Sequence, residues 1–179
     1  MGADKAALLV EGVPSAVRIA ASLADAGFPV SGLGREPIEG FGFVRDEAEH
    51  EGPAYALARF QAKSDAVFVA ACDLPRFDAR VVAFLGERIE GFDAAVPKAR
   101  GALQPLCGLY LAGAFSVLRE FVSSGERSMM GWLERLRVRE VSARELRLAG
   151  IDPRAVRGAN TPEEWRRLSR GGRHPGSIL

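Results

Sequence analysis

The feature that most constrains this chain is an apolar run without alternation, Ala66 to Cys72, which reads AVFVAAC. A half-exposed strand alternates apolar and polar residues, whereas a strand covered on both faces reads as one continuous apolar run. Elsewhere, short apolar runs alternate with amphipathic stretches, which is the pattern of βαβ units. The sequence therefore predicts an α/β fold built on a single doubly wound, mostly parallel sheet.

The remaining elements follow from periodicity and from the residues at helix ends. A capping box of Thr161, Pro162 and Glu164 predicts the last helix. Residues 1–169 are expected to form one domain and residues 170–179 a flexible tail. Strands are predicted at residues 29–34, 41–45, 66–72, 94–97, 106–112 and 138–142. Helices are predicted at residues 14–26, 52–63, 80–89, 115–122, 130–136 and 161–169.

Composition excludes several functional classes. With 24 basic and 23 acidic residues the net charge is +1, so no bulk field recruits nucleic acid or an anionic membrane. No apolar run approaches the roughly 18 residues of a membrane helix. Cys72 and Cys107 have no metal-ligand spacing, and two histidines give no basis for a histidine zinc site. We expect a cytoplasmic protein of one domain that binds neither nucleic acid nor a membrane.

Asp73 is the first candidate functional residue, because it directly follows the apolar run. In an open parallel sheet, ligands bind beyond the carboxyl ends of the strands. A carboxylate there can hold a hard cation such as Mg²⁺, which in turn contacts substrate phosphates. The alternative is that Asp73 only caps the turn before the next helix, and position alone does not separate the two interpretations.

Three further positions are ambiguous when each is taken alone. Asp46 follows a predicted strand, and the loop after it ends in Gly52-Pro53, where a glycine lets a base or a phosphate approach the backbone. Taken alone, these residues are better explained as an ordinary strand-to-helix loop whose acidic side chains are solvated. Asn160 next to the capping box fits turn chemistry, and Lys5 fits a solvated surface charge.

Five short motifs in order nevertheless resemble one family, the molybdenum cofactor guanylyltransferases, which are nucleotidyltransferases with a Rossmann-like fold. The family opens with a strand, a glycine-rich phosphate loop and a D-K-A-L-L run, and this chain begins MGADKAALL, as though entering that pattern halfway. The other four motifs are Asp46 with Glu51-Gly52-Pro53, Ala71-Cys72-Asp73-Leu74-Pro75, the run from Gln104 to Tyr110, and Asn160-Thr161-Pro162-Glu163-Glu164.

The resemblance implies transfer of GMP from GTP to the terminal phosphate of the molybdopterin cofactor, with release of pyrophosphate. Its implied partners are GTP and the molybdopterin cofactor, besides proteins of cofactor biosynthesis or molybdoenzymes. Such chemistry needs mainly positioning and charge neutralisation. The implied roles are Mg²⁺ binding for Asp73, phosphate neutralisation for Lys5, contacts along the nucleotide for Asp46, Gly52 and Pro53, and the pterin side for Asn160 and Gln104.

The match also departs from the family pattern. Gly158 replaces the usual Asn of the N-x-N-T-P run, Gln104 replaces the usual His before Pro-Leu, and the first strand and the phosphate-loop glycines do not occur. A buried strand of this kind contributes on the order of 8–15 kcal/mol, comparable with a whole domain's net stability of about 5–15 kcal/mol. We therefore expect the 179-residue chain to be weak or inactive.

Two explanations of the departure remain open. In the first, translation starts upstream, and roughly 10–20 further residues precede this sequence. In the second, Ala6 to Val10 (AALLV) occupies the vacant place in the sheet. Two functional alternatives also remain, a related nucleotidyltransferase that uses CTP, and a non-catalytic binding protein that kept the fold.

Overall fold

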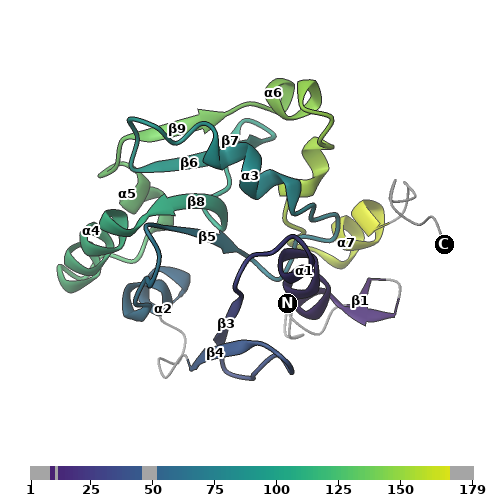
Figure 1. The fold of residues 1–179 in the computed structure, drawn as a ribbon, viewed down its shortest axis with the longest axis horizontal. Coiled ribbons are helices and arrows are strands. Elements are labelled where there is room, and N and C mark those ends of the chain that lie inside the picture. Colours follow the sequence, from purple (N-terminus) through teal and green to yellow (C-terminus); the bar gives the residue numbers. More distant parts are fainter. Residues whose placement is uncertain (1–8, 11, 46–51, 170–179) are drawn as a thin grey trace.

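The computed structural model describes residues 9–10, 12–45 and 52–169 of the chain (Figure 1). Its main sheet has the order β5–β8–β6–β9, and β7 forms a hairpin with the end of β6. β6 and β9 are parallel, while β8 runs antiparallel to both β5 and β6. These strands are β5 (Ala66–Ala70), β6 (Ala94–Ala99), β7 (Ala102–Leu103), β8 (Cys107–Leu111) and β9 (Val138–Val141).

Two small sheets lie outside this main sheet. β3 (Ser31–Gly34) and β4 (Gly42–Arg45) form a parallel pair, and β1 (Leu9–Val10) and β2 (Val13–Pro14) form an antiparallel pair. Figure 1 shows β3 and β4 below the main sheet and separate from it. The predicted α/β class is confirmed, with two differences from a single, mostly parallel sheet. The β3–β4 pair lies outside the main sheet, and the antiparallel strand β8 separates the parallel strands β5 and β6.

The predicted helices are present, with small shifts at their ends. The second helix ends at Arg59, before the predicted Lys63, because Phe60 adopts an extended backbone. The hairpin pairs β1–β2 and β6–β7 and the segments α6 and η2 were not predicted. The helices are α1 (Ser15–Asp25), α2 (Pro53–Arg59), α3 (Arg80–Gly86), α4 (Ala112–Ser123), α5 (Met129–Leu133), α6 (Ala143–Leu148), the 3₁₀ turn η2 (Pro153–Val156) and α7 (Pro162–Ser169).

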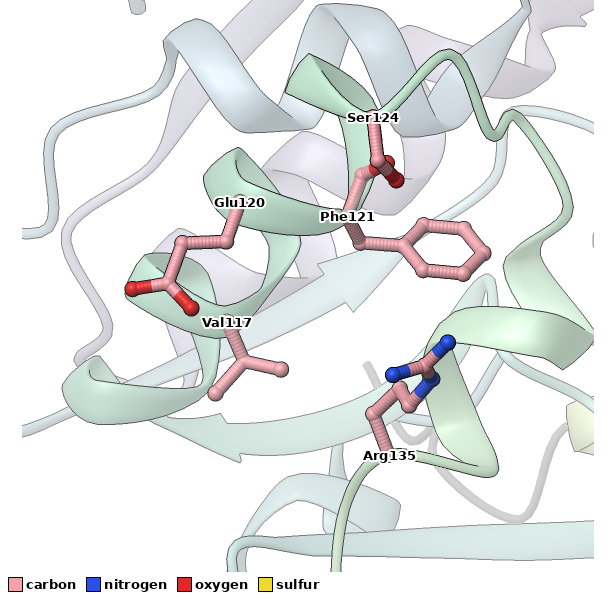
Figure 2. A pocket seen from close by; sticks show the side chains of 5 residues that line it. All are labelled: Val117, Glu120, Phe121, Ser124 and Arg135. Atoms are coloured by element: carbon pink, nitrogen blue, oxygen red, sulfur yellow. The ribbon is translucent and has the colours of Figure 1, made fainter.

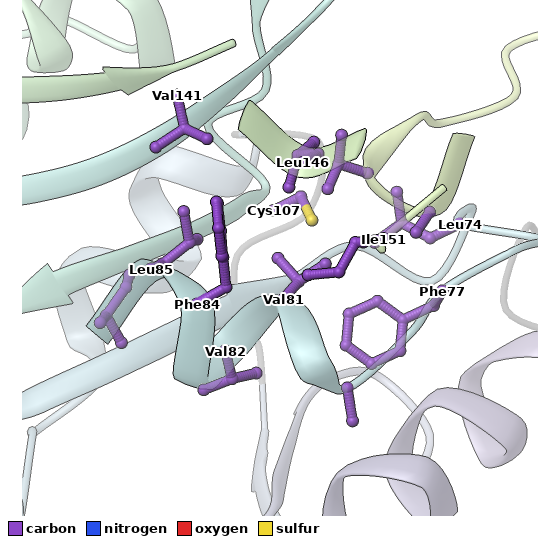
Figure 3. Close-up of a cluster of buried hydrophobic side chains, with 14 of the residues drawn as sticks. Leu74, Phe77, Val81, Val82, Phe84, Leu85, Cys107, Val141, Leu146 and Ile151 are labelled. Carbon is purple, nitrogen blue, oxygen red and sulfur yellow. The ribbon is translucent and has the colours of Figure 1, made fainter. Parts of the chain in front are cut away.

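The main sheet is covered on both faces, as the apolar run predicts. On one face Ala95 and Leu109 pack in a cluster with α1, α3, α6 and η2, part of which Figure 3 shows. On the other face Ala94, Val96 and Tyr110 pack with α2, α4 and α5. Successive residues of β6 therefore enter opposite clusters, which is the alternation of a strand with two buried faces.

The first strand corrects one sequence-based hypothesis. Leu9 and Val10 do not enter the main sheet, because they pair with Val13 and Pro14 in the β1–β2 hairpin. Val10 is buried against α7 with Trp165, whose indole N–H donates to the carbonyl oxygen of Leu9 at 3.2 Å. Residues 6–8 of the proposed AALLV strand lie outside the described residues. The apolar side chain of Val10 is thus buried against α7, away from the main sheet.

Within the described residues, no helix combines the length and the hydropathy needed to span a membrane.

Candidate active site

Asp73 lies in the turn that leaves the carboxyl end of β5. The backbone N–H of Ala71 donates to the carbonyl oxygen of Leu106 at 2.7 Å, which continues the β5–β8 pairing beyond the strand. The N–H of Phe77 then donates to the carbonyl oxygen of Leu74 at 3.2 Å and closes the turn. Asp73 itself is half-buried. The chain thus presents a carboxylate at the edge where α/β sheets bind ligands.

Arg18 fastens this turn from α1. Its guanidinium donates to the carbonyl oxygen of Pro75 at 2.7 Å and to that of Leu74 at 3.3 Å. Leu74 and Pro75 are buried, so the Arg18 guanidinium supplies hydrogen bonds to carbonyl groups that bulk water does not reach. No pattern in the sequence around Arg18 predicts a contact with Leu74 and Pro75, which lie 56 and 57 residues further along the chain. Sequence reasoning therefore missed this residue.

The segment before α7 packs directly on Asp73. The backbone N–H of Ala159 donates to the carbonyl oxygen of Asp73 at 3.0 Å. A Cβ atom placed on Gly158 would lie 3.0 Å from Oδ1 of Asp73 and 3.5 Å from its Cγ. Asn160, the next predicted site residue, is exposed two residues beyond Gly158. The structure therefore brings Asp73 and the Asn160 segment together.

Glu164 anchors that segment. Its carboxylate accepts a hydrogen bond from the backbone N–H of Asn160 at 3.1 Å. This hydrogen bond, with further contributions from Arg157 and Arg100, lowers the pKa of Glu164. Three guanidinium groups contact the same carboxylate, those of Arg157 at 3.3 Å, Arg100 at 3.2 Å and Arg167 at 3.6 Å.

The capping box at this helix is confirmed in part. The N–H of Glu164 donates to Oγ1 of Thr161 at 3.1 Å, as predicted. The Glu164 carboxylate, however, binds the N–H of Asn160, one residue before the cap. The sequence signal found Glu164 as a capping residue but not as the anchor of the segment that contacts Asp73.

The other predicted site residues belong to other segments of the chain, and two of them lie outside the described residues. Gly52 and Pro53 begin α2, which packs against α4 and β3, and Figure 1 shows α2 well separated from α7. The Gln104 side-chain amide donates to the carbonyl oxygens of Ala102 and Leu103 at 3.1 and 3.2 Å, so it holds its own turn. Lys5 and Asp46 lie outside the described residues.

The residues around Asp73 fit a Mg²⁺ that is shared with a substrate. Among residues 9–10, 12–45 and 52–169 no group of three or more His, Cys, Asp or Glu side chains is arranged to hold a metal. Mg²⁺ does not need such a cage, because it is commonly held by one or two carboxylates together with water and phosphate oxygens. The backbone of Gly158 approaches the Asp73 carboxylate closely, because a Cβ at position 158 would lie 3.0 Å from Oδ1. A single carboxylate at the carboxyl end of β5 suits that mode of binding.

A surface hollow elsewhere on the molecule has a different character. It lies between α4 and Arg135, and Figure 2 shows the Phe121 ring beside the Arg135 guanidinium. Val117, Glu120 and Ser124 complete its lining. None of the predicted site residues contributes to it.

Comparison with known proteins agrees with the motifs. The family model of the MobA-like NTP transferase domain matches residues 1–141. A probable molybdenum cofactor guanylyltransferase from Nostoc sp. is 33% identical over 177 residues, which is 92% of this chain and 82% of the relative. Another from Synechococcus elongatus is 28% identical and covers 94% of this chain and 91% of the relative.

Solved structures share the fold. Molybdopterin-guanine dinucleotide biosynthesis protein A from Archaeoglobus fulgidus has a TM-score of 0.75 at 23% identity, with 94% of this chain and 90% of that chain covered. The 2-C-methyl-D-erythritol 4-phosphate cytidylyltransferase from Thermus thermophilus has a TM-score of 0.66 at 18% identity, with coverages of 94% and 93%. The family resemblance read from the motifs is confirmed, and this chain belongs to the MobA-like NTP transferases, a family of nucleotidyltransferases.

Proposed function

We propose that this nucleotidyltransferase acts in molybdenum cofactor biosynthesis and transfers GMP from GTP to the terminal phosphate of the molybdopterin cofactor. The family match and the names of the relatives support the reaction class. The observation that carries the proposal for this chain is the position of Asp73. Asp73 lies in the turn after the carboxyl end of β5, and Gly158, which has no side chain, lies beside its carboxylate.

In the proposed reaction, a bond forms between an oxygen of the acceptor phosphate and the α-phosphorus of GTP. The bond from that phosphorus to the bridging oxygen breaks, and pyrophosphate leaves with the electron pair. The attacking oxygen is already an anion, so no side-chain nucleophile is needed, and the protein contributes mainly positioning and charge neutralisation.

Asp73 is the residue that would hold Mg²⁺ at this site. When bound, the metal ion neutralises negative charge on the phosphates of the nucleotide and on the leaving pyrophosphate. In the same proposal Lys5 neutralises phosphate charge, Asp46, Gly52 and Pro53 lie along the nucleotide, and Asn160 and Gln104 face the acceptor. The hydrogen bond from the N–H of Ala159 to the carbonyl oxygen of Asp73 supports one part of this arrangement, because the Asn160 segment lies next to Asp73.

Calorimetric titration of GTP in the presence of Mg²⁺ tests the proposal. An active enzyme should bind GTP at micromolar concentration, and its affinity for GTP should fall by about tenfold or more in Asp73→Ala, the size typical of groups that support a metal. Asp65→Ala is the matched control, because Asp65 precedes the same strand and is exposed. This control should bind GTP like the parent chain.

The outcomes separate the alternatives. Weak binding by the parent chain with no effect of Asp73→Ala would contradict the proposal and favour a binding protein that kept the fold. A parallel titration with CTP tests the donor, since tighter Mg²⁺-dependent binding of CTP than of GTP would replace GTP with CTP. Pyrophosphate release on addition of the molybdopterin cofactor completes the test of the acceptor.

A further inference from the structure

The contact between Gly158 and Asp73 is tight enough to restrict the residue at position 158. A Cβ on Gly158 would lie 3.0 Å from Oδ1, 3.5 Å from Cγ and 3.7 Å from Oδ2 of Asp73. Close packing leaves little free space for such an atom, so the carboxylate would have to move by a few tenths of an ångström. The carboxylate is the flexible partner, since the backbone at Asp73 is tied to the N–H of Ala159.

We propose that Gly158 is a positioning residue for the Asp73 carboxylate. Residues 157–160 form a strap that fixes the distance between the Gly158 backbone and this carboxylate. This inference rests on the proposed function, in which Asp73 holds Mg²⁺. The strap contacts Asp73 at two points, the Gly158 backbone beside the carboxylate and the Ala159 N–H on the main-chain carbonyl oxygen. Together these contacts orient one carboxylate relative to its own backbone.

The strap is fixed at its far end by a charged anchor. The Glu164 carboxylate binds the N–H of Asn160, and Arg100 reaches it from the β6–β7 turn at 3.2 Å. Arg157, itself part of the strap, contacts the same carboxylate at 3.3 Å. The anchor therefore joins α7, the strap and the β6–β7 hairpin. Movement of the strap away from Asp73 would break several of these interactions together.

A side chain at position 158 would act through its contact with the Asp73 carboxylate and not through strain in its own backbone. Gly158 does not have the positive φ found at eight other described glycines, so alanine fits its backbone conformation. A displaced carboxylate would meet a shared Mg²⁺ at a less favourable distance, and Mg²⁺ demands near-ideal geometry. The metal dependence of nucleotide binding should therefore change.

The test measures the Mg²⁺ concentration at half-maximal GTP binding. We expect Gly158→Ala to raise this concentration by about tenfold. Gly113→Ala is the matched control, because a Cβ at Gly113 meets no atom within 4 Å, and it should leave the midpoint unchanged. Combined with Asp73→Ala, the Gly158→Ala change should have no further effect, since no carboxylate remains to be displaced.

The outcomes distinguish this inference from the proposed function. An unchanged midpoint in Gly158→Ala, together with a loss of binding in Asp73→Ala, would overturn the inference and leave the proposed function standing. Absence of Mg²⁺-dependent GTP binding in the parent chain would overturn both. If Gly158→Ala does not fold, Glu164→Gln provides the test. It weakens the anchor without touching Asp73 and should raise the midpoint by about two- to tenfold, and no rise would contradict the strap.

Discussion

The carbonyl oxygen of Asp73 accepts a hydrogen bond of 3.0 Å from the backbone N–H of Ala159. The turn after β5 and the segment before α7 therefore meet through their main chains. A main-chain hydrogen bond does not depend on which side chains stand at the two positions. It holds the Asn160 segment beside the carboxyl end of β5 whatever occupies the site.

Arg18→Met should loosen the turn that carries Asp73. The change keeps an unbranched side chain and removes the donors to the carbonyl oxygens of Leu74 and Pro75, both of which are buried. The carbonyl oxygen of Leu74 keeps the N–H of Phe77, whereas that of Pro75 loses the guanidinium, so the protein should lose about 1–3 kcal/mol of unfolding free energy. Urea denaturation measures the loss. Arg119→Met, at an exposed arginine that donates to Ser116, is the control and should cost much less.

Glu145 should make stability depend on pH in the acid range. Its carboxylate accepts hydrogen bonds from the N–H and hydroxyl of Ser142 and pairs with Arg139, which lowers its pKa to about 2. A folded-state pKa below the unfolded value of about 4.3 means that this stability is complete above pH 4.3 and is lost as the pH falls toward 2. Because the Glu145 side chain is 30% exposed, we expect it to contribute about 1 kcal/mol to the free energy of unfolding.

Unfolding free energies of the parent chain and Glu145→Gln, measured from pH 7 to pH 2, test this expectation. The difference between them should be largest above pH 5 and should vanish near pH 2. Glu126→Gln, at an exposed position, is the control and should differ little from the parent chain over the whole range. A difference between parent chain and Glu145→Gln that stays constant with pH would exclude the capping carboxylate as its source.

Local sequence signals predicted the elements well and their pairing less well. The unalternating run before Asp73 identified β5 because burial on both faces leaves a direct trace in composition. The antiparallel direction of β8 left no such trace, because it follows from the hairpin connection through β7. The missed helix α6 did have a signal, the capping box of Ser142 and Glu145, which sequence analysis did not use.

The candidate site shows the same division. Asp73 was identified from its place after a buried strand, which is a local property. The contact of Gly158 with its carboxylate joins segments that are distant in sequence, so no local pattern reports it. Gly158 was visible beforehand only as a departure from the family pattern, and its physical meaning came from the packing. The roles of Lys5 and Asp46 stay predictions, because both residues lie outside the described ranges.

Trp132→Phe should be among the more costly conservative changes. The Trp132 indole is fully buried, stacks on Tyr110 with ring centroids 4.6 Å apart, and donates to the carbonyl oxygen of Ala114 at 3.1 Å. Phenylalanine leaves a cavity and removes the hydrogen bond from the indole, which together should cost about 2–4 kcal/mol. Chemical denaturation measures the cost. Tyr55→Phe, at a half-buried position of the same cluster, should cost less than half as much.

Hydrogen exchange should divide the amides of β5 into two sets. The N–H of Ala71 and the carbonyl group of Asp65 both form hydrogen bonds with the segment that contains β8. In an antiparallel pair, the backbone groups that face the partner strand belong to every second residue. The N–H groups of Val67 and Val69 therefore also point to β8. Those of Phe68 and Ala70 then point to the other edge. In the part of the chain that the structure describes, that edge pairs with no strand.

We therefore expect Phe68 and Ala70 to exchange roughly 10- to 100-fold faster than Val67 and Val69 under native conditions. Leu109 of β8 is the internal control, since β8 has strand partners on both edges and its amides should all exchange slowly. An apolar strand with one open edge is a template for pairing with a further strand. Equal protection of the two sets would contradict the expectation that this edge of β5 is open in solution.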